Sequence, residues 1–347
     1  MAPKIFLTGA TGFVGGTILS TIHESYPNYE YTLLVRSKDR AKPIAENYPD
    51  AKFVYGHHDS TDVIEKAASE ADIVIHTAES ADTVSEAEAI AKGLTAGHSA
   101  ENPGYYLHLS GSGVLTWYDL ENKRYGEPPL PEQKYNDIHD IDRIINLPDD
   151  AYHKNVDNIV QSIDSNVVKY LIVAPPVIYG VVKGMVNKSS LTVPILSEAT
   201  FDLGYTPYVG AGTTEWDHVH VEDLADLFKK CVEASQDPSK KDHPEIWGKR
   251  AYYFTRNGEH KYKDLAEWIA EEAHRQGYIP EPKTQSITFE YATGYKAGLV
   301  WGINSKGEAE RAKKYLGWER KGPSLKETIA EAVAIAAKAK GLEPKYK

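Results

Sequence analysis

Short apolar runs alternate with longer amphipathic stretches along the first half of the chain. The apolar, β-prone runs predict strands, and the stretches between them predict helices. The predicted strands are residues 5–8, 31–35, 53–55, 72–77, 105–109 and 167–173, and the predicted helices are residues 17–26, 63–70, 86–97 and 152–162. Strands and helices that alternate at this spacing are typical of an α/β fold with a parallel, doubly wound sheet covered on both faces.

The pattern is interrupted once and continues less regularly afterwards. Residues 114–150 contain Pro128, Pro129, Pro131 and Pro148 together with many acidic residues, which predicts a long, partly ordered excursion near the functional site. The later part predicts strands and helices at residues 189–201, 216–221, 222–235, 250–254, 262–276, 308–316 and 325–338.

The first predicted strand runs directly into a glycine turn. In the stretch KIFLTGATGFVGG, Gly9, Gly12 and Gly15 follow the strand at a spacing of three and lead into a helix. This order sets a helix N-terminus against a pyrophosphate, and the second strand ends about 20 residues later, as a mononucleotide-binding half-fold requires. The sequence therefore predicts a dinucleotide-binding core at residues 1–180. Residues 181–347 are predicted to be mainly a smaller substrate-binding lobe, with residues 216–254 returning to the core.

Composition narrows the possible functions. The chain has 347 residues, 41% of them hydrophobic, and a net charge of −11 with no long basic run, so nucleic acid is not an expected partner. Cys231 is the single cysteine and cannot form an intramolecular disulfide. No signal-peptide core and no apolar stretch of membrane-spanning length is present, so we expect a cytoplasmic protein with no membrane partner. The expected partner is a small-molecule substrate, and a homo-oligomer is an open alternative.

Several separated stretches resemble one family, the extended short-chain dehydrogenase/reductases, which include nucleotide-sugar epimerases, dehydratases and carbonyl reductases. The matching stretches are TGATGFVGG at the start, DIVIHTA at residues 72–78, PPVIYG at 175–180, WDHVHVEDLADL at 216–227 and INSKGEAERAKKYLGWE at 303–319. The resemblance covers nearly the whole chain. It implies a Rossmann fold and a nicotinamide cofactor, whereas the reaction stays open because this fold carries many chemistries.

The residue after the second strand bears on the choice of cofactor. NAD enzymes usually place a carboxylate there for the ribose 2′-hydroxyl, but this chain has Arg36 with Ser37, Lys38 and Arg40 behind it. A guanidinium and a hydroxyl suit a 2′-phosphate, so NADP(H) is favoured over NAD(H). The cofactor-binding residues expected from the resemblance and this argument are Gly9, Thr11, Gly12, Phe13, Val14, Gly15, Arg36, Ser37, Arg40, His57, His58, Thr77, Ala78, Lys154, Pro175 and Ile178.

The adenine end departs from the family pattern. The family commonly has Gly-Asp after the third strand, whereas this chain has Gly56-His57. A neutral imidazole can accept a hydrogen bond or stack, and Asp59 is an alternative acceptor. The alternative interpretation is that His57 and His58 are ordinary loop residues. No third ligand accompanies these two histidines at a suitable spacing, so no metal site is predicted.

The resemblance also implies a serine after the fifth strand and a Tyr-x-x-x-Lys pair on the next helix. Ser112 fits the serine position, with Ser110 as a possible replacement, and Lys154 fits the lysine position. Four residues before Lys154, however, is Asp150, and Tyr152 is only two residues away. Positions i and i+4 share a helix face and positions i and i+2 do not, so either Asp150 is the acid or base, or a tyrosine from elsewhere enters the site.

These residues predict an NADP(H)-dependent oxidoreductase that acts on a carbonyl or alcohol of a small organic molecule. The first alternative is a nucleotide-sugar epimerase or dehydratase. The second, of a different class, is a non-catalytic NADP-binding sensor, because the standard tyrosine is missing.

Overall fold

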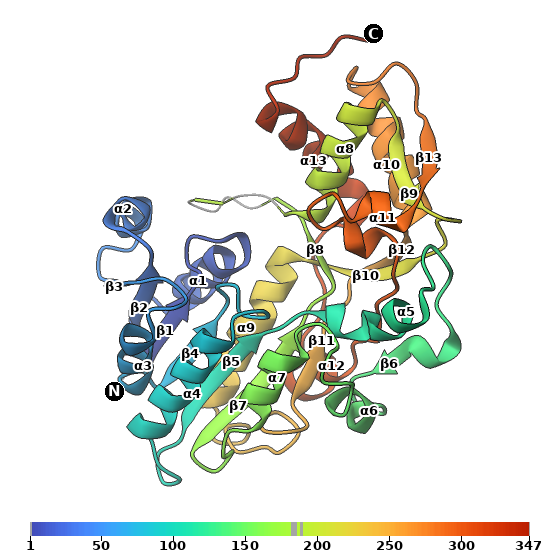
Figure 1. Cartoon of the computed structure of the whole chain (residues 1–347). Helices are drawn as coiled ribbons and strands as arrows, with labels where there is room; N and C mark the ends of the chain where they lie inside the picture. The colour runs from blue at the N-terminus through green and yellow to red at the C-terminus, as the bar shows by residue number, and fades with distance from the viewer. Residues whose placement is uncertain (1, 182–185, 188–189, 347) are drawn as a thin grey trace.

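The computed structural model describes residues 2–181, 186–187 and 190–346, and in this part of the chain the central element is a seven-stranded sheet (Figure 1). Its order is β3-β2-β1-β4-β5-β7-β11, and every neighbouring pair is parallel. The strands are β1 (Lys4–Thr8), β2 (Glu30–Val35), β3 (Lys52–Tyr55), β4 (Ile73–His76), β5 (Gly104–Leu109), β7 (Val168–Ala174) and β11 (Tyr252–Phe254). The predicted parallel, doubly wound sheet is confirmed.

Helices cover both faces of this sheet because its strands are apolar on both sides. In β1, Ile5 and Leu7 pack into one buried cluster and Phe6 packs into the other, as the alternation of side chains along a strand requires. One layer contains α3 (Thr61–Ser69), α4 (Val84–Gly97) and α7 (Lys154–Gln161), and the other contains α1 (Phe13–Ser25), α2 (Lys38–Asn47), α9 (Val221–Gln236) and α12 (Arg311–Leu316) (Figure 1). None of the described helices has the length and apolar character needed to cross a bilayer.

The strand order reverses at β1, whose neighbours are β2 on one side and β4 on the other. The crossover helices of these two halves lie on opposite faces of the sheet, which leaves a crevice outside the carboxyl ends of the two strands. The glycine turn directly follows β1, so the predicted phosphate-binding segment lies at this crevice.

A second lobe lies beyond the carboxyl edge of the sheet (Figure 1). It contains a three-stranded sheet in the order β12-β10-β8, the parallel pair β13-β9, and three larger helices that share one buried cluster. The elements are β8 (Val177–Tyr179), α8 (Thr192–Leu203), β9 (Thr206–Val209), β10 (Glu215–His220), β12 (Gly258–Lys261), α10 (Tyr262–Arg275), β13 (Thr284–Ile287), α11 (Phe289–Ala292), η3 (Gly298–Trp301) and α13 (Leu325–Ala339).

The segment 114–150 is more ordered than the sequence predicts. It contains the end of η1 (Ser112–Thr116), α5 (Trp117–Asn122), η2 (Pro131–Gln133), β6 (Lys134–Asn136) and α6 (Ile141–Ile145), and β6 pairs with β14 (Lys306–Glu308). The buried carboxylate of Asp119 accepts two 2.7 Å hydrogen bonds from the backbone and side-chain nitrogens of Asn304. The prolines prevent long elements here, but contacts with a distant part of the chain hold the segment in place.

Most predicted elements of the core are present with their ends shifted by a few residues. The helix predicted at 152–162 begins at Lys154, and that difference matters for the site. Helix α2 was not predicted, because Pro43 and a hydrophilic composition hide its periodicity.

Candidate active site

The glycine turn leaves a space that larger side chains at its glycine positions would fill. Gly9 has a φ of +82°, and a Cβ there would lie 2.6 Å from Thr77 Oγ1. A Cβ on Gly15 would lie 2.3 Å from the Gly9 carbonyl oxygen. Gly12 is the N-cap of α1 and provides no capping side chain. The backbone N–H groups of the first turn of α1 therefore face the crevice, as a bound pyrophosphate requires.

Hydrogen bonds between the ends of β1 and β4 fix the position of this turn. The Thr77 hydroxyl donates to the Thr8 carbonyl oxygen at 2.6 Å. The Thr8 hydroxyl accepts from the backbone nitrogens of Thr77 and Ala78, both at 3.2 Å. Because each threonine holds the other strand, the two sides of the crevice keep a constant separation.

Two hollows meet at the glycine turn, where both are lined by Gly12 and Thr77. We call the smaller one, of about 190 Å³, the Arg36 pocket; its lining includes the predicted residues Gly9, Thr11, Gly12, Arg36, His57, His58, Thr77 and Ala78. We call the larger one, of about 800 Å³, the His153 cleft; its lining includes the predicted residues Gly12, Phe13, Val14, Gly15, Thr77, Pro175 and Ile178. Together they form a groove with the shape of an extended dinucleotide site.

Arg36 follows β2 and is the predicted basic residue that lines the Arg36 pocket. Ser37 and Arg40 do not line it, contrary to expectation. The Ser37 hydroxyl instead caps α2 by accepting from the Arg40 backbone nitrogen at 3.4 Å, and the Arg40 side chain is exposed on that helix. His58 faces Glu79, with 3.6 Å between Nδ1 and Oε2. The contact predicted for a 2′-phosphate is therefore reduced to Arg36.

Ser110 rather than Ser112 reaches the His153 cleft after β5. Ser110 lines the cleft, and its hydroxyl lies beside the Asp157 carboxylate. Ser112 is buried and points elsewhere, with its Oγ 2.7 Å from Ser305 Oγ. Ser112, the predicted serine, thus has a structural contact, whereas Ser110, the alternative, lines the cleft.

Tyr152 and His153 reach the cleft because α7 begins only at Lys154. His153 is its N-cap, with a φ of +68°, and both residues line the cleft. His153 Nδ1 lies 2.9 Å from Asp82 Oδ1, and this hydrogen bond lowers the pKa of Asp82. The Nε2 edge of the ring packs on the glycine loop after β5, where Gly111 and Gly113 leave room for it. Since an ionised carboxylate only accepts, Nδ1 is the donor of this hydrogen bond.

Lys154 and Asp150 do not reach the cleft. The Lys154 ammonium is buried and donates to the Ile145 carbonyl oxygen at 2.7 Å and to Gln161 Oε1 at 3.2 Å. It lines a separate groove, and burial lowers its pKa. Asp150 is exposed and lines neither hollow. Lys154, which was expected to bind the cofactor and act in catalysis, therefore lies outside both hollows, where the Ile145 carbonyl oxygen and Gln161 hold its ammonium.

Sequence reasoning missed His153 and Asp157. They have the same i, i+4 spacing as the expected Tyr-x-x-x-Lys pair and therefore share one face of α7. Asp157 is fully buried and accepts from the Tyr252 hydroxyl at 2.8 Å. Burial raises its pKa, whereas the Ser110 and Tyr252 hydroxyls lower it. A search for any pair of proton-carrying residues at that spacing would have found the two.

Comparison with known proteins agrees with this geometry. Residues 9–179 match a family model described as NAD(P)H-binding. The chain is also 32% identical over 351 residues to oxidase ucsJ of an Acremonium species, covering 99% of this chain and 100% of the relative. The protein belongs to the family that includes oxidase ucsJ, and its residues 9–179 form an NAD(P)H-binding domain.

Solved structures of other proteins share the fold at low identity. The dTDP-glucose 4,6-dehydratase of Bacillus anthracis, in complex with NAD, has a TM-score of 0.66 and 15% identity, and the match covers 98% of each chain. The UDP-glucose 4-epimerase of Thermotoga maritima, with UDP-glucose, has a TM-score of 0.61 and 16% identity, and the match covers 97% of this chain and 99% of the epimerase. They confirm the extended Rossmann architecture.

The walls of the His153 cleft are more apolar than a site for a charged sugar nucleotide would need. Its apolar lining comes from the core and the second lobe: Val14, Leu109, Pro175, Pro176, Val177, Ile178, Leu191, Trp216, Leu299 and Val300. Within the described residues, no arginine or lysine lines it, and its carboxylate, Asp82, is paired with His153.

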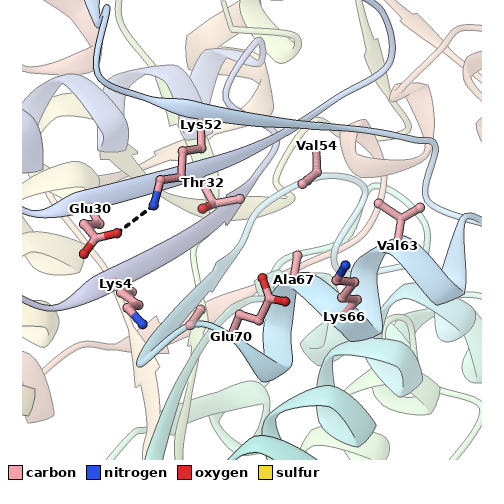
Figure 2. Close-up of a pocket in the computed structure, with 10 residues that line it drawn as sticks. Lys4, Glu30, Thr32, Lys52, Val54, Val63, Lys66, Ala67 and Glu70 are labelled. Carbon is pink, nitrogen blue, oxygen red and sulfur yellow. Dashed lines mark hydrogen bonds and ion pairs between the residues drawn. The ribbon is translucent and has the colours of Figure 1, made fainter.

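A further hollow, of about 410 Å³, lies at the amino edge of the sheet, beside β1 to β3 and α3 (Figure 2). Lys4, Glu30, Lys52 and Lys66 contribute charges of both signs, and Lys52 Nζ lies 2.8 Å from Glu30 Oε2. In doubly wound sheets, ligands bind at the opposite edge, where the glycine turn lies. This hollow is therefore not the dinucleotide site.

Proposed function

We propose that the protein is an NADP(H)-dependent oxidoreductase that interconverts a carbonyl and an alcohol on a small, neutral organic molecule, with His153 as the proton-carrying residue. The observation that carries this proposal is the position of His153: its ring lines the cleft beside the glycine turn, and Asp82 holds its Nδ1 at 2.9 Å. An imidazole exchanges protons near neutral pH, so it supplies the chemistry that the expected tyrosine would provide.

The residues at the glycine turn fit a dinucleotide. The turn excludes a Cβ at Gly9 and Gly15, and α1 begins at Gly12 without a capping side chain. Arg36 lines the adjoining pocket and would bind a 2′-phosphate, which supports NADP(H) over NAD(H). A bound nicotinamide supplies or accepts the hydride; this chain's residues position the substrate and move the proton.

Two side chains would act on the substrate oxygen. Ser110 lines the cleft, and its buried hydroxyl would turn to donate a hydrogen bond to the carbonyl oxygen as that oxygen gains negative charge. His153 Nε2 would give its proton to the same oxygen in reduction and take it back in oxidation. Asp82 would orient the ring and stabilise its charged form, in the way that a carboxylate holds a histidine in other proton-transfer sites.

The second candidate function is that of a nucleotide-sugar epimerase or dehydratase, favoured by the structural relatives. Such a substrate carries a pyrophosphate, which proteins commonly bind with arginine or lysine. The described lining of the cleft offers neither residue, so a neutral substrate fits the site better. A change in the fluorescence of bound NADPH when UDP or dTDP is added would favour the sugar-nucleotide function.

The deciding experiment measures NADPH consumption with a panel of neutral aldehydes and ketones. We expect His153→Gln to lower kcat about 10²-fold or more, within the range for loss of a general acid, while NADPH binding is retained. His139→Gln is the matched control, because His139 is exposed and lies outside the cleft. An undiminished rate for His153→Gln would overturn the proposed role, and tight NADPH binding without turnover of any carbonyl would favour the sensor alternative.

A further inference from the structure

A row of buried ionisable side chains lies between the sheet and helices α4 and α7. It consists of Glu86 on α4, His76 on β4, His108 on β5 and Asp157 on α7, and each of these residues has an exposure of 0%. His76 and His108 are register partners on neighbouring strands, so they project side by side from the same face of the sheet.

Neighbouring members of the row lie within 4 Å of one another, but the two contacts between an imidazole and a carboxylate are not hydrogen bonds in the described structure. His76 Nε2 lies 3.5 Å from Glu86 Oε1, the Nδ1 atoms of His76 and His108 are 3.2 Å apart, and His108 Nε2 lies 3.7 Å from Asp157 Oδ1. Beyond this ion pair, the Glu86 carboxylate has no hydrogen-bond donor in the described part of the chain. Each imidazole therefore has a polar neighbour on both of its nitrogens, which is the arrangement that lets a ring accept a proton at one nitrogen and release one at the other.

The two ends of the row lie beside different parts of the cofactor groove. Glu86 lines the Arg36 pocket, and Asp157 lies beside Ser110, which lines the His153 cleft. Burial of unpaired ionisable groups costs several kcal/mol per group, and apolar side chains of similar size often stabilise a core at least as well. A purely structural role therefore gives no reason for the row to join these two hollows.

We propose that Glu86, His76, His108 and Asp157 form a buried proton path from the Arg36 pocket to the His153 cleft, which rests on the proposed function and is a second proton supply for carbonyl reduction, separate from His153. Glu86 takes a proton from solvent and passes it to His76 Nε2; His76 releases its Nδ1 proton to His108, and His108 releases its Nε2 proton to Asp157. Asp157 protonates the Ser110 hydroxyl as that hydroxyl gives its own proton to the substrate oxygen. One proton enters and one leaves, and no electrons move along the path.

Other titratable groups face the path from every neighbouring element. The Tyr106 hydroxyl on β5 lies 2.8 Å from His76 Nδ1, and the Tyr252 hydroxyl on β11 donates to Asp157. His153 and Lys154 at the start of α7 act on the Asp157 carboxyl through their charge. Burial lowers the pKa of His108 and raises that of Asp157, so burial disfavours the charged form of each group.

The path can be tested without any carbonyl substrate. The nicotinamide ring of NADP⁺ carries a positive charge that NADPH lacks, so NADP⁺ bound next to Ser110 should expel a proton from the path and NADPH should not. The experiment uses the His153→Gln variant, which lacks the other proton-carrying side chain of the cleft. Proton release is followed with a pH-indicator dye in a stopped-flow instrument, and binding is followed by tryptophan fluorescence.

In this background we expect proton release to follow NADP⁺ binding at the same rate. With His108→Gln added, which interrupts the path with a polar side chain, release should be about tenfold slower or more while binding is unchanged. His76→Gln should act in the same way and serves if the His108 variant does not fold. His260→Gln is the matched control, because His260 forms an equally buried pair with His218, 3.1 Å between their Nδ1 atoms, outside the path.

Equal proton release with NADP⁺ and NADPH, or unchanged release kinetics in both path variants, would overturn the proton path. This outcome is separate from a failure of the proposed function, which would show as binding without carbonyl turnover and would leave the proton measurement intact.

Discussion

Lys154 Nζ donates a 2.7 Å hydrogen bond to the carbonyl oxygen of Ile145, outside the His153 cleft. We therefore expect Lys154→Met to lower the free energy of unfolding by about 1–3 kcal/mol, the effect of leaving a buried acceptor unpaired, with little change in kcat. Urea unfolding and NADPH consumption measure the two effects. Lys249→Met, an exposed position in the same groove, should change neither quantity. A large loss of kcat at unchanged stability would restore the lysine role implied by the family resemblance.

Ser110 and Ser112 should have opposite roles although they are two residues apart. Ser110→Ala removes a donor from the cleft, so we expect kcat to fall about 10-fold to 100-fold with little loss of stability. Ser112→Ala breaks the 2.7 Å contact with Ser305 and should lower the melting temperature instead. Steady-state kinetics and thermal unfolding of the two variants decide between them, and the reverse pattern would contradict the assignment of Ser110.

Arg36→Glu should shift the cofactor preference from NADPH towards NADH. The substitution replaces a guanidinium with a carboxylate that repels a 2′-phosphate and can accept from a 2′-hydroxyl, so the ratio of the two dissociation constants should change by about 10²-fold. Calorimetric titration with both cofactors measures it. Lys42→Glu makes the same change of charge on α2, away from the pocket, and should leave the ratio unaltered. Similar effects of both variants would indicate a general charge effect.

His218 makes the stability of the protein depend on pH. Burial lowers the pKa of this imidazole to about 4, from an ordinary value of 6.5. Between these values the unfolded chain binds more protons than the folded one, so stability is complete above pH 6.5 and is lost as the pH falls towards and through 4. We expect His218 to account for about 2–3 kcal/mol of this loss.

Urea unfolding at several values between about pH 7 and pH 4.5 measures this dependence. His218→Asn should show a shallower loss of stability than the wild-type protein over this range. An identical slope in the two proteins would show that other groups cause the acid sensitivity.

The fold could be predicted from the sequence because hydrophobic periodicity and turn-forming residues are local features of the chain. Ile5, Phe6 and Leu7 are apolar in succession, which predicts a strand buried on both faces, and the glycines that follow leave one conformation for the turn. The residues of the candidate active site could not be predicted in the same way, because their positions depend on the residue at which α7 begins. With His153 in a left-handed conformation as the N-cap, the residues that face the cleft are Tyr152 and His153, and Lys154 turns away.

The two serines show the same limit. Ser110 and Ser112 have the same side chain and flank the same glycine, so local sequence favours neither. The choice is made by Ser305, 193 residues away, which holds Ser112 outside the cleft. The buried row of ionisable residues could not be predicted either. In the sequence, His76 and His108 are single polar residues in apolar strands, and only the register of the sheet shows that they are neighbours.

The hydrogen bonds of Ser112 with Ser305 and of Asp119 with Asn304 have a consequence for folding order. They span 193 and 185 residues, more than half of the chain, and each closes on the segment that follows β5. Contacts of such high sequence separation form late, because the loop between them must be ordered first. During synthesis the Rossmann sheet can begin to assemble early, but the loop that carries Ser110 can lock into place only after residues 304 and 305 have left the ribosome.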